Sequence, residues 1–142
     1  MKKKVVLEIA GGLLMLLFTY AGVSKILQFK KFIRQLDNQP LPNSWTPLLS
    51  YAIPGTELAM VILLAVSACR RWGFLLSALF MLVFTVYAAL ILSNGFSYVP
   101  CSCGGVIEQL TWKQHLVFNV VFLLISIWGT VLSFQKISRE PA

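Results

Sequence analysis

Residues 72–93 of the chain read WGFLLSALFMLVFTVYAALILS and contain no charged side chain. A helix needs about 20 consecutive apolar residues to cross the roughly 30 Å of hydrocarbon in a bilayer. This stretch meets that requirement without help from its neighbours. It therefore predicts a membrane-spanning helix.

Three further stretches have the length and apolar character of membrane spans, at about residues 5–26, 48–68 and 112–134. The first could also be a signal peptide, but Glu8 interrupts it and no convincing cleavage site follows. We keep it as a membrane helix. The expected fold is all-α: one polytopic transmembrane domain over residues 1–142, built as a four-helix bundle.

The composition agrees with a membrane protein. Hydrophobic residues make up 58% of the chain and charged residues 12%, with a mean hydropathy of +0.79. So few charges cannot cover the surface of a soluble domain of this length. The net charge of +7 does not indicate nucleic acid, because the bases stand at the ends of the apolar runs, where they face lipid headgroups.

Four spans place both ends of the chain on one side of the membrane. Bases are more numerous on that side: Lys2, Lys3, Lys4, Arg70, Arg71, Lys136 and Arg139, against Lys25, Lys30, Lys31, Arg34 and Lys113 on the other. The positive-inside rule then predicts cytoplasmic termini in a bacterial inner membrane. The segment before the last span would face the periplasm.

The segment between the first two spans, residues 27–45, alternates apolar and basic side chains at near-helical spacing. Its apolar set is Leu27, Phe29, Phe32, Ile33 and Leu36, and its basic set is Lys30, Lys31 and Arg34. We expect a short amphipathic helix in the outer headgroups, with a flexible wetted loop as the alternative. Thr46 with Pro47 predicts a capped start for the second span, and Thr111 with Gln114 has the capping-box spacing before the last.

The most distinctive motif is Pro100-Cys101-Ser102-Cys103-Gly104-Gly105, before the last span. A disulfide between cysteines separated by one residue closes a small, strained ring, which makes the bond exchangeable. An oxidising outer compartment suits thiol exchange. An inert pair, a local staple, or a zinc or copper site with His115 and Glu108 remain alternatives, although no fourth strong metal ligand is evident and our prediction includes no metal.

Polar residues from three spans are expected at similar depth beneath this motif. Lys25 ends the first span, Glu57 follows Pro54 and Gly55 in the second, and His115 begins the fourth, with Asn119 one turn later. A carboxylate inside a membrane is costly unless it is paired or faces a cavity, so Glu57 is a candidate functional residue. His115 could raise the thiolate fraction of a cysteine, or could simply cap or pack; Lys25 and Glu57 could form a purely structural ion pair.

The chain resembles the MauE/DoxX group of small four-helix membrane proteins. The resemblance rests on Tyr20-Ala21-Gly22-Val23-Ser24-Lys25, on Pro54-Gly55-Thr56-Glu57, on the cysteine motif, and on Trp112, His115, Phe118 and Asn119. It implies a redox-associated membrane protein of the kind linked to methylamine utilisation or to quinone-coupled oxidation of sulfur compounds. Cys101 and Cys103 would be its redox pair, and Lys25, Glu57, His115 and Asn119 its polar residues at the membrane boundary.

The leading hypothesis is thiol–disulfide exchange with a periplasmic carrier or client protein, with a membrane quinone as the candidate electron acceptor by analogy with other four-helix disulfide oxidases. His115 would assist Cys101 or Cys103 in catalysis. Two alternatives stay open: a non-enzymatic membrane subunit or assembly factor whose cysteines fix a loop, and a small proton-coupled transporter that uses Glu57 and Lys25. The oligomeric state is not predicted.

Overall fold

The structure, a computed structural model, describes residues 2–93 and 111–139. Its helices are α1 (Lys2–Leu27), α2 (Phe29–Asp37), α3 (Thr46–Ala65), α4 (Arg70–Leu92) and α5 (Trp112–Arg139), with a short 3-10 turn, η1, at Asn43–Trp45. No strand occurs within these described ranges. Four helices of this described part are long and apolar enough to cross a membrane, which confirms the all-α, multi-pass prediction.

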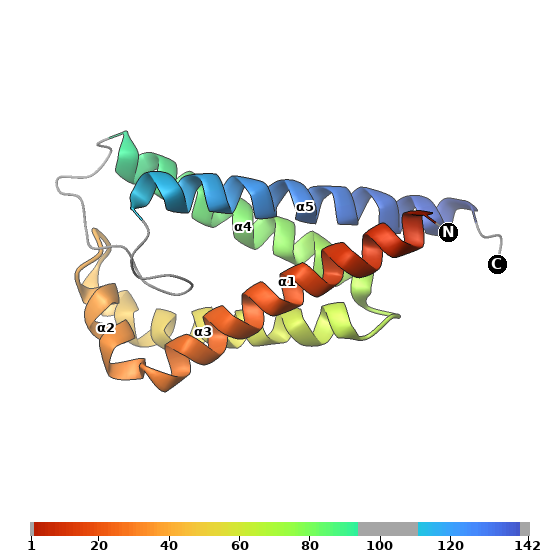
Figure 1. The fold of residues 1–142 in the computed structure, drawn as a ribbon. Coiled ribbons are helices and arrows are strands. Elements are labelled where there is room, and N and C mark those ends of the chain that lie inside the picture. The colour runs from red at the N-terminus through yellow and green to blue at the C-terminus, as the bar shows by residue number, and fades with distance from the viewer. Residues whose placement is uncertain (1, 94–110, 140–142) are drawn as a thin grey trace.

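The four long helices lie side by side in a bundle (Figure 1). α4 and α5 run antiparallel and share the most extensive contact, and α1 packs mainly on α3; contacts of α3 with α4 and of α1 with α5 close the ring. The start of α1 and the end of α5 lie at one end of the bundle, which we call the terminal end. α2, the start of α3, the end of α4 and the start of α5 lie at the other, which we call the α2 end.

The bundle interior is apolar and closely packed. Leu14, Phe18, Met60, Leu64 and Phe74 are almost wholly buried there. Many equally apolar side chains point outward instead, because four helices of this length have more apolar surface than their contacts can cover. An apolar exterior is unfavourable in water and favourable in lipid, so the packing agrees with the hydropathy.

Helix α5 approaches α4 closely at a glycine. A Cβ atom added to Gly129 would lie 2.4 Å from ring atoms of Phe74, closer than any carbon contact allows. Small residues commonly permit such approaches between membrane helices, since packing rather than hydrophobicity holds the helices together in lipid. Gly129 therefore sets how near the two backbones can come.

The helix ends confirm one sequence prediction and correct another. The backbone N–H of Thr111 donates to Gln114 Oε1 (2.9 Å), and the N–H of Gln114 donates to Thr111 Oγ1 (3.3 Å), so the predicted capping box is present. Thr46, in contrast, does not cap α3. It is the first residue of that helix and is buried, while the cap position is Trp45, which makes no side-chain cap bond.

The segment after α1 forms the predicted amphipathic helix. Phe32 and Leu36 of α2 are buried, whereas Lys30 and Arg34 are exposed. Leu27 departs from the prediction: it ends α1 and is 79% exposed, so it does not belong to the buried face. α2 is held against α3 by Phe29, whose ring centroid lies 5.3 Å from that of Tyr51.

Candidate functional site

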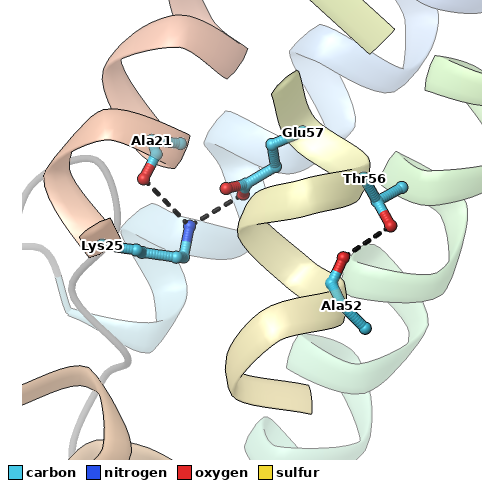
Figure 2. Close-up of polar contacts among 5 residues, drawn as sticks. All are labelled: Ala21, Lys25, Ala52, Thr56 and Glu57. Carbon is cyan, nitrogen blue, oxygen red and sulfur yellow. Dashed lines mark hydrogen bonds and ion pairs between the residues drawn. The ribbon is translucent and has the colours of Figure 1, made fainter. Parts of the chain in front are cut away.

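A buried ion pair joins α1 and α3 near the α2 end (Figure 2). Lys25 Nζ lies 2.7 Å from Glu57 Oε1, and the two side chains are only 9% and 4% exposed. Lys25 stands in the last turn of α1, and Glu57 lies three residues after Pro54 in α3. The sequence prediction that these residues reach similar depth is consistent with this contact.

The ammonium group of Lys25 has further partners. It also donates to the carbonyl oxygen of Ala21, at 3.5 Å, and it lies 5.8 Å from the ring centroid of Phe32 in α2. A buried cation is tolerated only where such groups replace its lost hydration. The ammonium group of Lys25 thus contacts polar groups of α1 and α3 and, in addition, the aromatic ring of Phe32 from α2.

The carboxylate of Glu57 is only half satisfied. Its Oε1 accepts from Lys25, while its buried Oε2 has no hydrogen-bond partner among the described residues. A buried acceptor without a donor costs about 1–3 kcal/mol, and more for a charged group. Such an atom is available to a donor that the described residues do not supply, which is why we treat Glu57 as the centre of the candidate site.

His115 lies in the first turn of α5, as predicted, and is half-buried. Its Nε2 is buried and has no hydrogen-bond partner in the part of the chain that the structure describes, and its ring centroid lies 6.0 Å from that of Trp112. Asn119 lies one turn further along α5 and is also half-buried. Among the hydrogen bonds and ion pairs of the described residues, none joins His115 to Lys25 or Glu57.

Cys101 and Cys103 lie outside the described residues, so their redox role stays a prediction. The segment that carries them connects Leu92 of α4 to Trp112 of α5, and both helix ends belong to the α2 end of the bundle. Cys69, which precedes α4 near the terminal end, is a half-buried free thiol. Within the described ranges, no three His, Cys, Asp or Glu residues gather as a metal site.

One contact at this end was not foreseen. The hydroxyl of Tyr87 in α4 donates a short hydrogen bond to Oε1 of Gln39, a buried residue just after α2. Gln39 lies in a proline-containing connection without periodicity, so no sequence signal identifies it as a tertiary contact. Gln39, two residues after α2, thus binds the helix that leads to the cysteine segment, while Phe32 of α2 lies against the ion pair.

The fold and the site define a small multi-pass membrane protein: four spanning helices with a buried lysine–glutamate pair near one end. A family model described as methylamine utilisation protein MauE matches residues 3–132, and the chain belongs to the MauE family. The match does not extend to DoxX, so that half of the resemblance stays a prediction. No curated protein and no solved structure matches the chain.

Proposed function

We propose that the chain is a membrane component of periplasmic thiol–disulfide exchange, with Cys101 and Cys103 as its redox pair. Membership of the MauE family associates it with methylamine utilisation, and we infer that it supports disulfide formation in a periplasmic partner of that process. This assignment includes an inner-membrane location with cytoplasmic termini, which rests on the distribution of bases.

The proposed step transfers two electrons. A thiolate of the partner protein attacks the Cys101–Cys103 disulfide, and the resulting mixed disulfide is resolved by the partner's second thiol. The partner gains a disulfide, and Cys101 and Cys103 become thiols carrying two electrons and two protons. For turnover, a membrane quinone would accept the two electrons and two protons from these thiols, which restores the disulfide, and would leave as the quinol.

The observation that carries the proposal is the half-satisfied carboxylate of Glu57 at the α2 end. Oxidation of a dithiol releases two protons, and Glu57 Oε2 is a buried acceptor to which no described residue donates. The hydroxyl of a quinol could donate a hydrogen bond to this oxygen. Glu57 is therefore the described residue that best fits the role of proton acceptor. Lys25 keeps the carboxylate in place through Oε1.

Thiol labelling in intact cells tests the proposal directly. An impermeant maleimide, applied with and without reductant, should label Cys101 and Cys103 only after reduction. Cys69, near the terminal end, should not react from outside and serves as the internal control. Labelling of both cysteines without reductant would contradict a resting disulfide. Labelling of Cys69 from outside, with Cys101 and Cys103 protected until permeabilisation, would invert the topology and contradict a periplasmic reaction.

The buried ion pair favours a second candidate, proton-coupled transport. An intramembrane carboxylate with one oxygen that no described residue binds is the kind of group that carries protons in transporters. In that case Glu57→Gln would abolish uptake of the transported solute, and replacing both Cys101 and Cys103 by serine would leave uptake intact. Thiol exchange predicts that the serine substitutions abolish turnover.

A further inference from the structure

The corner between α1 and α2 forms an open depression with cationic and apolar walls. Its volume is about 430 Å³, and it is lined by Leu27, Gln28, Phe29, Lys30, Lys31 and Arg34. It lies where the apolar span α1 ends, at Leu27. In a bilayer this is the depth at which acyl chains give way to headgroups.

The charge of this depression is strongly one-sided. Lys30, Lys31 and Arg34 are all basic, and Asp37 is the single acid of α2. Lys30 and Arg34 are exposed, and among the described residues no ion pair joins either of them to an acid. Lys30 and Arg34, both on this wall, favour an anionic occupant.

The remaining lining identifies which anion fits. Leu27 is 79% exposed and stands beside Phe29, so the cationic wall adjoins an apolar one. Inorganic phosphate has no apolar part that could contact Leu27 and Phe29. A phospholipid has both features, since its phosphodiester would lie against the cations and the first methylenes of its chains against Leu27 and Phe29.

We propose that this depression binds the headgroup of an anionic phospholipid of the surrounding bilayer, and that the bound lipid holds α2 in place over the Lys25–Glu57 pair. The second part follows from the contacts of α2. Phe29, a wall of the depression, packs on Tyr51 of α3, and Phe32, less than one turn away, lies against the ammonium of Lys25. A ligand that restrains Lys30 and Arg34 restrains the same short helix.

The test uses the full-length protein purified in detergent and given phosphatidylglycerol or phosphatidylcholine with identical chains. Native mass spectrometry measures the lipid retained. We expect preferential retention of phosphatidylglycerol. Because a cation near the membrane surface contributes about fivefold to anionic lipid binding, the Lys30→Gln/Arg34→Gln variant should bind phosphatidylglycerol roughly 25-fold more weakly. Both side chains are exposed, so these substitutions leave the packed face of α2 intact.

Two control variants accompany this one: the first matches it in the charge removed, and the second matches it in location. Lys3→Gln/Lys4→Gln removes the same charge at the terminal end, and Lys113→Gln removes an exposed cation at the α2 end. Both should retain phosphatidylglycerol like the unmodified chain. Equal retention of the two lipids, loss of binding in either control, or displacement of phosphatidylglycerol by inorganic phosphate would overturn the site.

Hydrogen exchange tests the second part separately. Phosphatidylglycerol should slow amide exchange in α2 at least severalfold relative to phosphatidylcholine, and it should not do so in the Lys30→Gln/Arg34→Gln variant. Unchanged exchange of α2 despite retained lipid would overturn the role of the lipid in holding the helix.

Discussion

Lys25 Nζ lies 2.7 Å from Glu57 Oε1 inside the bundle, and Glu8 Oε1 lies at the same distance from Arg70 Nη1 at a more exposed position. The two ion pairs therefore share their length and differ in burial. Glu57 and Lys25 are almost wholly enclosed, whereas the side chain of Glu8 is 54% exposed. Comparing the two pairs therefore separates the contribution of an ion pair to the free energy of unfolding from the contribution of its burial.

Breaking the buried pair should be far more costly than breaking the exposed one. Lys25→Met leaves the Glu57 carboxylate buried without a counterion, and we expect a loss of about 3–5 kcal/mol in the free energy of unfolding. Glu8→Gln should cost less than about 1 kcal/mol. Unfolding in detergent, followed by circular dichroism, measures both.

The double variant Lys25→Met/Glu57→Met tests whether the pair is retained for stability. It removes both charges, so it should recover most of the stability that Lys25→Met loses. If the double variant is folded and inactive in thiol oxidation, the pair serves the reaction. Full activity in the double variant would show that Lys25 and Glu57 are purely structural.

Gly129 is predicted to be intolerant of any side chain. In Gly129→Ala the new methyl would overlap the ring of Phe74, which is fully buried, so we expect a loss of about 1–3 kcal/mol. Gly12→Ala is the matched control, because no atom lies within 4 Å of a Cβ there. Phe74→Leu should partly rescue Gly129→Ala by removing the overlapping ring, and equal stability of the two glycine variants would contradict the close approach of α4 and α5.

Tyr87→Phe should loosen α2 without unfolding the bundle. The substitution removes the hydroxyl that donates to Gln39, a bond we expect to contribute about 0.5–1.5 kcal/mol. Amide exchange should rise in α2 more than in α3 or α5. Tyr20→Phe, at an exposed position on α1, is the control and should change nothing. A uniform rise over all helices would mean that the bond stabilises the whole bundle rather than α2.

The cysteine motif gives the sharpest functional prediction. Cys101→Ser/Cys103→Ser should abolish oxidation of a partner dithiol while the protein keeps its helical content and its unfolding midpoint. A single variant cannot form the Cys101–Cys103 disulfide, so its remaining thiolate can form a mixed disulfide only by attacking the disulfide of an oxidised partner, with release of a partner thiolate. The cysteine whose retention gives this species, detected by gel shift under non-reducing conditions, is the one that bonds to the partner. Residual turnover in the double variant would favour an assembly factor in which the cysteines only fix a loop.

Much of the fold follows from local patterns. The uncharged stretch around Phe80, the alternation around Phe32 and the Thr111–Gln114 spacing each predicted an element that the structure contains. Thr46 misled because Thr-Pro is a good helix start in general, yet here the turn η1 precedes it and places Trp45 at the cap. Cap chemistry depends on the incoming backbone direction, which residue identity alone does not specify.

The candidate site divides in the same way. Hydropathy by itself determined that four helices are long and apolar enough to cross a membrane. It also placed Lys25, Glu57 and His115 toward one end, because the position of a residue along a membrane-spanning helix gives its depth in the bilayer. Only the tertiary structure decided that Lys25 meets Glu57, that Phe32 covers the ammonium and that Gln39 reaches Tyr87. Those contacts depend on how each helix is rotated about its axis. With apolar side chains on every face of a membrane helix, that rotation is set by packing against neighbours and not by the sequence of one helix.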